Sequence, residues 1–139
     1  MKPDKIVGIY LAAGKSTRMG SDKLRLPLGS MHLGSYALAA ALHSKLDYVA
    51  IVSGDGTADW INRTFYQEPI HRKWAVFHCS EAHLGQSYSL RCGVVAAQAK
   101  HAAALMILLA DQPLITTTMI NELLFHYQVT TDVGLVVLF

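Results

Sequence analysis

The residues best suited to chemistry stand in one short segment near the N-terminus of the chain. The segment reads Leu11, Ala12, Ala13, Gly14, Lys15, Ser16, Thr17, Arg18, Met19, Gly20, Ser21, Asp22, Lys23. A turn with so little side-chain bulk lets its backbone N–H groups approach a polyphosphate closely. Lys15, Arg18 and Lys23 add positive charge, and the Arg18 guanidinium matches two phosphate oxygens. The segment therefore predicts a phosphate-binding loop; the alternative is an ordinary turn with surface cations.

Two familiar phosphate-binding motifs do not fit this segment. The P-loop pattern G-x-x-x-x-G-K-[ST] fails by one residue, because Gly8 stands six positions before Gly14. The dinucleotide pattern G-x-G-x-x-G is absent as well, since Gly14 has no glycine two positions away. If the loop binds phosphate, it does so as a different motif.

A second candidate is Asp111, which directly follows the apolar run Ala104–Ala110. A carboxylate at the tip of a buried strand can bind Mg²⁺, which takes one or two carboxylates together with phosphate oxygens. Alternatively, Asp111 opens the Gln112-Pro113 turn by accepting hydrogen bonds from backbone amides. Position in the sequence alone leaves both readings open.

A third candidate is the segment Gly85–Gly93, which reads Gly-Gln-Ser-Tyr-Ser-Leu-Arg-Cys-Gly. It would begin a helix whose first amides suit a ribose, a base or an anionic group. In the structural alternative, Ser87 is a plain N-cap, and Leu90, Val94 and Val95 are core contacts. The two readings are compatible.

The remaining metal-type residues carry a weaker signal. His78, Cys79, Glu81 and His83 lie close in sequence but do not match a paired-ligand spacing, which disfavours zinc. Cys79 and Cys92 are the only cysteines, have no C-x-x-C spacing and do not suggest a disulfide framework.

Strand and helix patterns alternate around these candidates. We expect strands at Lys5–Leu11, Tyr48–Ser53, Trp74–His78, Ala104–Ala110 and Val133–Phe139. We expect helices at Ser35–Ser44, Ala58–Phe65, Ser87–Lys100 and Thr117–His126, with a short helical turn at Arg18–Met19. This alternation predicts βαβ units and a mainly parallel sheet with helices on both faces. Ligands of such sheets collect at the carboxyl ends of the strands, so the first loop and Asp111 should face one crevice.

Composition narrows the class of protein. The 139 residues, 52% of them apolar, suffice for one core, so we expect a single domain over residues 1–139. A net charge of only +2 gives no broad footprint for nucleic acid. The longest apolar stretch, Ala102–Ala110, is far shorter than the roughly 18 residues of a membrane helix. The N-terminus leaves no room for a signal peptide, so we expect a cytoplasmic protein with no membrane partner.

Three motifs in order carry a resemblance to a known family. The spacing L-A-A-G-x-S-x-R-M-G-x-x-K, the Gly85–Gly93 segment and the A-D-Q-P of Ala110–Pro113 resemble the molybdenum cofactor cytidylyltransferases. Their relatives are the purine-catabolism (xanthine dehydrogenase) accessory proteins and the molybdopterin-guanine dinucleotide synthases. The resemblance runs from about Ile6 to Leu123. It implies an α/β fold, a Rossmann-like three-layer αβα domain of the nucleotide-diphospho-sugar transferase type.

The resemblance also implies roles for individual residues. It gives Arg18, Lys23 and Asp111 to catalysis and makes Asp111 the Mg²⁺ ligand. The implied nucleotide-binding positions are Leu11, Ala12, Ala13, Gly14, Lys15, Ser16, Arg18, Met19, Gly20, Lys23, Gly85, Ser89 and Leu90.

The implied reaction joins CMP from CTP to molybdopterin with release of pyrophosphate, and serves maturation of a xanthine dehydrogenase-type hydroxylase. A non-catalytic nucleotide- or cofactor-binding accessory protein is the main alternative. Transfer of a guanylyl group, or transfer to a sugar phosphate, is an alternative within the enzymes.

The chain departs from the family pattern at its other end. In relatives, the region after A-D-Q-P supplies a second acidic metal ligand from a G-D-containing stretch, and nothing here matches it. The closing residues Gly134–Phe139 resemble G-H-P-V-L-F, but Leu135 and Val136 replace the His and Pro. We therefore expect a shortened family domain with slow turnover or none. An uncovered apolar strand at Val133–Phe139 would favour self-association.

Overall fold

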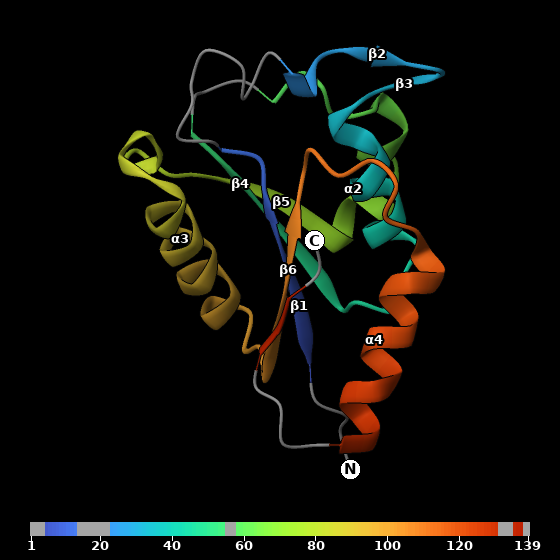
Figure 1. The fold of residues 1–139 in the computed structure, drawn as a ribbon, viewed down its shortest axis with the longest axis vertical. Coiled ribbons are helices and arrows are strands. Elements are labelled where there is room, and N and C mark those ends of the chain that lie inside the picture. Colours follow the sequence, from blue (N-terminus) through green and yellow to red (C-terminus); the bar gives the residue numbers. More distant parts are fainter. Residues whose placement is uncertain (1–4, 14–22, 55–57, 131–134, 138–139) are drawn as a thin grey trace.

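A parallel sheet of five strands forms the centre of the computed structural model, which describes residues 5–13, 23–54, 58–130 and 135–137. The strands are β1 (Ile6–Leu11), β4 (Tyr48–Ser53), β5 (Trp74–His78), β6 (Ala104–Leu109) and β7 (Leu135–Val137). They are ordered β5-β4-β1-β6-β7, and every neighbouring pair is parallel. The carboxyl ends of β1 and β6 point to the top of Figure 1.

Helices cover both faces of this sheet (Figure 1). Helix α3 (Gln86–Ala99) packs on one face against β1 and β4, and α2 (Gly34–Leu42) and α4 (Thr117–Thr130) lie on the other. All six residues of β1 are buried, because a central parallel strand meets a helix layer on each side. Ile6 and Tyr10 enter the core beneath α2 and α4, whereas Ile9 packs on the α3 side. The three-layer αβα architecture predicted from the sequence is confirmed.

Smaller elements complete the described chain. A hairpin of β2 (Pro27–Leu28) and β3 (Met31–His32) leads into α2, with Gly29 at the tip in the left-handed region, φ 65°. Three short 3₁₀ helices follow: η1 (Arg63–Tyr66), η2 (Ile70–Lys73) and η3 (Ala82–Leu84). No helix within the described ranges is long and apolar enough to cross a membrane.

The strand predictions are confirmed closely, with identical bounds for β4 and β5. Three of the predicted helices form α2, α3 and α4 with small shifts at their ends. The predicted turn at Arg18–Met19 lies outside the described residues.

The predicted helix at Ala58–Phe65 is wrong. This segment makes a turn at Asp59–Trp60 and then the 3₁₀ helix η1. Two of its backbone groups bond to a distant side chain: Ser35 Oγ donates to the Trp60 carbonyl oxygen at 2.7 Å, and the Asn62 N–H donates to Ser35 Oγ at 2.9 Å. The backbone bonds within the segment, Ile61 N–H to the Ala58 carbonyl oxygen and Phe65 N–H to the Asn62 carbonyl oxygen, span three residues and not the four of an α-helix. The Asn62 side chain then accepts from the Thr64 N–H and caps η1.

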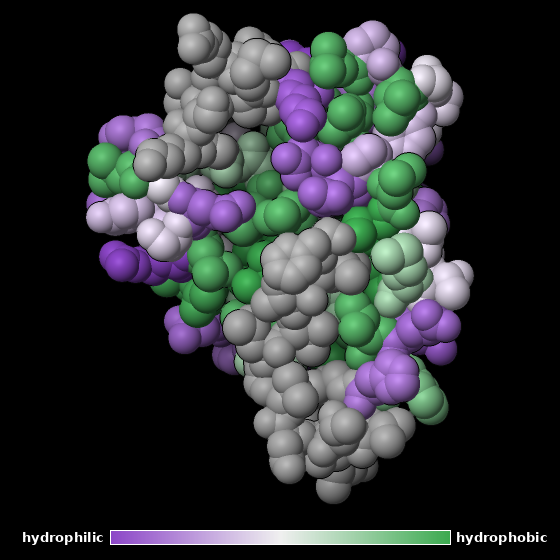
Figure 2. All heavy atoms as spheres, viewed as in Figure 1, coloured by the Kyte–Doolittle hydropathy of each residue, from purple (hydrophilic) through white to green (hydrophobic). Residues whose placement is uncertain are grey.

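Hydrophobic residues are exposed on the face of the molecule seen in Figure 1. In the space-filling view from the same side, several of them are visible between α3 and α4 (Figure 2). Polar residues lie around the rim of the same view. Two of the exposed large hydrophobic residues are Leu114, which precedes α4, and Phe125, which lies on α4.

Candidate functional site

A pocket of about 130 Å³ opens at the carboxyl ends of β1 and β6. Its described lining consists of Leu11, Ala12, Ala13, Leu24, Gln86, Leu109, Ala110 and Asp111. We expected the first loop and Asp111 to face one crevice. This is confirmed for Leu11, Ala12 and Ala13 at the start of the loop segment and for Asp111. The first residues of the two motifs are almost 100 positions apart in the sequence. They meet at this pocket because parallel strands end at the same edge of a sheet.

Backbone hydrogen bonds fix the floor of the pocket. The Ala12 N–H donates to the Val52 carbonyl oxygen at 2.9 Å, and the Ala110 N–H donates to the Leu11 carbonyl oxygen at 3.1 Å. These bonds continue the sheet one residue beyond β1 and β6. Because its N–H is engaged, Ala12 can line the pocket with its methyl group but cannot offer that amide to a phosphate.

Asp111 stands at the rim of the pocket with an exposed side chain. Among the residues that the structure describes, none donates a hydrogen bond to its carboxylate. The turn that follows is closed by the backbone, with the Gln112 N–H donating to the Leu109 carbonyl oxygen at 3.3 Å. Within the described part of the chain, no contact therefore supports the turn-opening alternative for Asp111.

Lys23 directly precedes the pocket residue Leu24 in the sequence. Its side chain is exposed, while the adjacent Leu24 is buried and lines the pocket. Leu24 packs against the start of α2, where a Cβ added at Gly34 would lie 3.0 Å from the Leu24 Cβ and 2.7 Å from Trp60 Cε3. Gly34 thus allows Leu24 and Trp60 to pack close to the helix.

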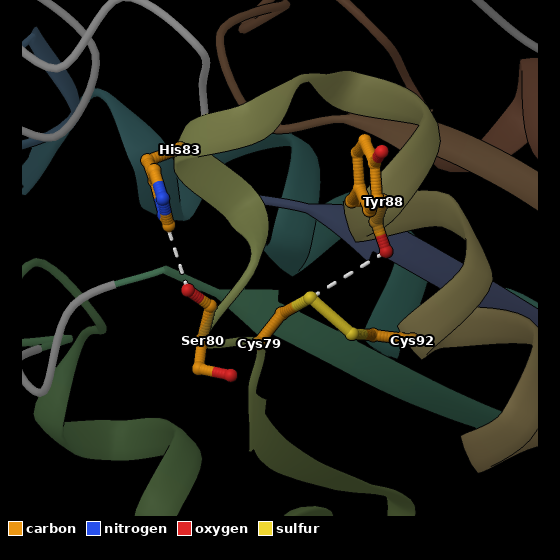
Figure 3. The surroundings of a disulfide bond; sticks show 5 residues. All are labelled: Cys79, Ser80, His83, Tyr88 and Cys92. Carbon is orange, nitrogen blue, oxygen red and sulfur yellow. Dashed lines mark hydrogen bonds between the residues drawn. A yellow bond between two sulfur atoms is a disulfide. The ribbon is translucent and has the colours of Figure 1, made fainter.

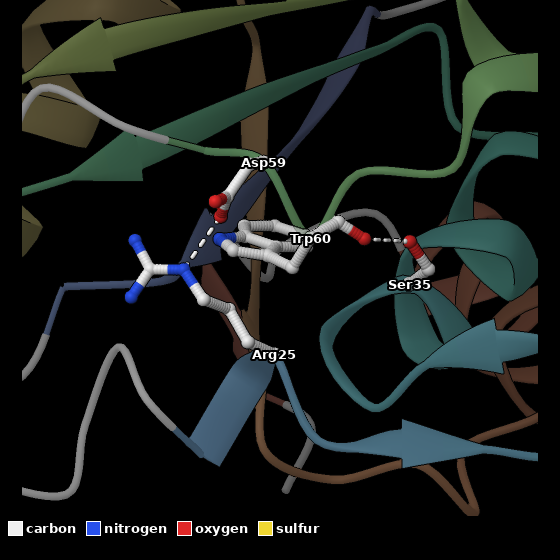
Figure 4. Close-up of polar contacts among 4 residues, drawn as sticks. All are labelled: Arg25, Ser35, Asp59 and Trp60. Carbon is white, nitrogen blue, oxygen red and sulfur yellow. Dashed lines mark hydrogen bonds and ion pairs between the residues drawn. The ribbon is translucent and has the colours of Figure 1, made fainter.

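A second contact ties this segment to the turn after β4. Arg25 Nε donates to Asp59 Oδ1 at 2.6 Å (Figure 4). The hydrogen bond from Arg25 holds the pKa of Asp59 below its usual value. The neighbouring Trp60 is anchored by Ser35, as the same view shows. Leu24 and Arg25 together fix the backbone from which Lys23 extends.

Tyr10 supports the site from within the core. Its hydroxyl donates to the Gly34 carbonyl oxygen at 2.5 Å, and its ring lies 6.1 Å from that of Trp60. Burial raises the pKa of Tyr10 well above its ordinary value, so the phenol remains a neutral donor. Tyr10 is a structural support and not a proton carrier.

The start of α3 differs in detail from the sequence-based expectation. The helix begins at Gln86, and Gly85, with φ 142°, occupies the cap position, so Ser87 is not the N-cap. Gln86 is the residue of this segment that lines the pocket. Ser89 is fully buried with no hydrogen-bond partner for its Oγ in the described structure, and Leu90 packs against the core on the α3 side. Val95 is exposed and is not a core contact. Gly85, Ser89 and Leu90 do not line the pocket formed by the described residues.

Several predicted residues cannot be placed. Outside the described residues lie Gly14, Lys15, Ser16, Arg18, Met19 and Gly20. Their assignment to nucleotide binding remains a prediction.

The expectation about the cysteines is wrong, because Cys79 and Cys92 form a disulfide (Figure 3). Cys79 directly follows β5 and Cys92 lies on α3, with their Cα atoms 6.0 Å apart. Their sequence spacing contains no sign of this pairing, since it depends on how α3 packs over the sheet. A bonded Cys79 has no thiolate to offer a metal, and the described residues contain no group of three or more His, Cys, Asp or Glu that could hold one.

Several solved structures share this fold. The chain superposes on Rv0371c from Mycobacterium tuberculosis with a TM-score of 0.67 at 22% identity, over 89% of this chain and 60% of that one. A manganese complex of Rv0371c gives 0.58 at 20% identity, over 87% and 58%. CMP:2-keto-3-deoxy-manno-octonic acid synthetase complexed with CTP gives 0.67 at 17% identity, over 93% and 49%. The fold is thus the Rossmann-like fold of nucleotidyltransferases.

The chain belongs to the family of MobA-like NTP transferase domains, whose model matches residues 8–138. It is 38% identical over 125 residues to the purine catabolism protein PucB of Bacillus subtilis, which covers 88% of this chain and 61% of PucB. The chain therefore spans about three fifths of the length of PucB and of Rv0371c.

Proposed function

We propose that this chain carries the nucleotide-binding part of a Mg²⁺-dependent cytidylyltransferase that transfers CMP from CTP to molybdopterin. The observation that carries the proposal is the pocket that brings Leu11–Ala13 and Asp111 together. Family membership and the likeness to PucB support it, as does the neighbour with bound CTP. We further propose that the product serves a xanthine dehydrogenase-type hydroxylase in purine catabolism.

The described residues fit a divalent metal at Asp111. An exposed carboxylate with no competing hydrogen bond from the described residues is the hard oxygen ligand that Mg²⁺ prefers. The manganese complex of a structural neighbour supports a divalent ion in this fold. When bound, Mg²⁺ would neutralise charge on the phosphates of the nucleotide.

The chain itself would contribute position and charge. In the proposed reaction an oxygen of the acceptor phosphate forms a bond to the α-phosphorus of CTP, and the bond from that phosphorus to pyrophosphate breaks. Lys15, Arg18 and Lys23 would surround the triphosphate with positive charge. Leu11, Ala12 and Ala13 would line the side of the pocket against which the nucleotide lies, at the end of the sheet.

Pyrophosphate release tests this proposal directly. With molybdopterin and Mg²⁺ present, we expect CTP to yield pyrophosphate and GTP to yield much less, because a pocket built for one base leaves polar groups unpaired with another. CTP binding without pyrophosphate release would instead indicate an accessory carrier. Preference for GTP would indicate the guanylyl branch of the family.

Removing charge from the phosphate loop should weaken nucleotide binding. We expect Lys23→Ala to reduce CTP affinity about 10- to 150-fold, the equivalent of about 1.5–3 kcal/mol for a charge-assisted contact, and Arg18→Ala to do the same. Because Lys23 is exposed, its substitution should leave the unfolding free energy unchanged. Isothermal titration of CTP provides the measurement, and Lys45→Ala, an exposed lysine after α2, is the matched control. Equal CTP affinity in both loop variants and the control would refute the phosphate-binding role.

A further inference from the structure

The disulfide ties the wall of the proposed nucleotide site to the sheet. Cys79 is held at the end of the sheet, where its N–H donates to the Ser53 carbonyl oxygen at 2.8 Å. Cys92 lies on the second turn of α3. The bond between them closes a loop of chain that contains η3, Gly85 and the first turn of α3 (Figure 3).

This closed loop contacts the pocket at two places. Gln86 lines the pocket together with Asp111. On the neighbouring side, a Cβ added at Gly54 would lie 3.0 Å from the Ala82 Cβ and 3.2 Å from the Ala13 Cβ. Ala82 and Ala13 therefore face the same narrow space beside Gly54, so a displacement of η3 would be transmitted to the pocket residue Ala13.

The closed loop has few other attachments. Its backbone hydrogen bonds in the described structure are local, such as Leu84 N–H to the Glu81 carbonyl oxygen and Gly85 N–H to the Ala82 carbonyl oxygen. Of its 3₁₀ helix only Ala82 is buried, and Leu84 is half exposed.

The rest of α3 is anchored differently. A Cβ added at Gly93 would lie 2.4 Å from Ile9 Cγ2, and Ala96 and Ala97 pack against the buried Val7 and Ala50 of the sheet. The second half of the helix is thus held by packing along its length, whereas η3 and the first turn are joined to the sheet through the buried Ala82 and Ser89 and through the disulfide.

We propose that Cys79 and Cys92 form a redox-sensitive clasp that holds the nucleotide-site wall in place, so that reduction lowers nucleotide affinity. The part concerning the nucleotide rests on the proposed function. A cross-link restricts the open states of the loop that it closes, and local opening becomes more frequent when the cross-link is removed.

The redox step requires a dithiol reductant of the kind that cells and reagents supply. Its thiolate attacks the half-buried sulfur of Cys92, since Cys79 is only 1% exposed, and Cys79 leaves as a thiolate and takes up a proton. The second thiol of the reductant then attacks the mixed disulfide, releases Cys92 as a thiol and closes the reductant's own disulfide. Two electrons and two protons pass from the reductant to the protein.

The clasp itself is tested by hydrogen–deuterium exchange on the whole chain, oxidised and then reduced with dithiothreitol. Thiol titration first establishes the two states, and the readout is unambiguous because the chain has only two cysteines. On reduction we expect amide exchange in residues 80–88 to accelerate about tenfold, while residues 93–99 remain unchanged as an internal control. Two titratable thiols in protein purified without reductant would overturn the clasp, as would equal exchange of residues 80–88 in both states.

The effect of the disulfide clasp on the proposed nucleotide site is tested by titrating CTP and Mg²⁺ into the oxidised and the reduced protein. We expect reduction to weaken binding about three- to tenfold, and Cys92→Ala to match the reduced parent with or without reductant. Equal CTP affinity of the oxidised and reduced parent, with faster exchange in residues 80–88, would overturn control of the site. If the oxidised protein binds no CTP, the proposed function fails, whereas the exchange measurement still decides whether the clasp exists.

Discussion

Replacing Asp111 with asparagine is expected to lower Mg²⁺-dependent pyrophosphate release on the order of a thousandfold, the equivalent of several kcal/mol of transition-state stabilisation. The change keeps the shape of the side chain and removes the charge that would hold the metal. Since Asp111 is exposed and no described residue donates a hydrogen bond to it, the unfolding free energy should shift by less than about 0.5 kcal/mol.

The measurement is pyrophosphate release with CTP, molybdopterin and Mg²⁺, accompanied by CTP titration without metal. Metal-free affinity should stay near the parent value, because the carboxylate is assigned to the metal and not to the nucleotide. Glu122→Gln, an exposed carboxylate on α4 away from the pocket, is the matched control and should be fully active if the parent is active. Undiminished turnover in Asp111→Asn would remove Asp111 from the metal site, and an equal loss of metal-free binding would make it a nucleotide contact.

The sequence predicted the sheet well because the strands have simple causes. Apolar runs bounded by turn residues define β1, β4 and β6, and a central parallel strand is buried on both faces along its full length. The meeting of Leu11 with Asp111 then follows from the parallel arrangement alone. No contact between distant side chains had to be known.

The incorrect predictions, the helix at 58–65 and the unpaired cysteines, both depend on contacts between residues far apart in the sequence. The 58–65 segment has Trp60, Ile61 and Phe65 at positions that suit a helix, yet all three reach the core from a turn and a 3₁₀ helix. Ser35 makes this possible by bonding the backbone of a segment 25 to 27 positions away. The disulfide likewise depends on the angle at which α3 crosses β5.

At the candidate site, too, the sequence does not determine which individual side chains of a segment line the pocket. The resemblance implies nucleotide-binding positions at Gly85, Ser89 and Leu90, and these assignments remain predictions. Among the described residues of this segment, Gln86 lines the pocket, because it is the first residue of the helix and lies nearest the strand ends. Ser89, three residues further along the helix, is fully buried. The position of the helix start, which the motif does not give, decides which side chain reaches the pocket.

Gly93→Ala is expected to destabilise the protein by about 1–3 kcal/mol, against the usual benefit of about 1 kcal/mol for alanine over glycine within a helix. The added methyl would lie 2.4 Å from Ile9 Cγ2 and 3.3 Å from Val52 Cγ2. Both neighbours are fully buried and β-branched, so neither can rotate away without clashing elsewhere. The helix must therefore lift off β1 and β4.

Urea denaturation measures this loss, with Gln98→Ala, an exposed position on the same helix, as the control that should stay within about 0.5 kcal/mol of the parent. Unfolding of Gly93→Ala at the parent's urea midpoint would show that α3 does not approach the sheet this closely. The expected lifting also has a functional consequence, because Gln86 is carried by the same helix. A surviving Gly93→Ala protein should bind CTP more weakly than the control, which would link the depth at which α3 packs to the geometry of the proposed nucleotide site.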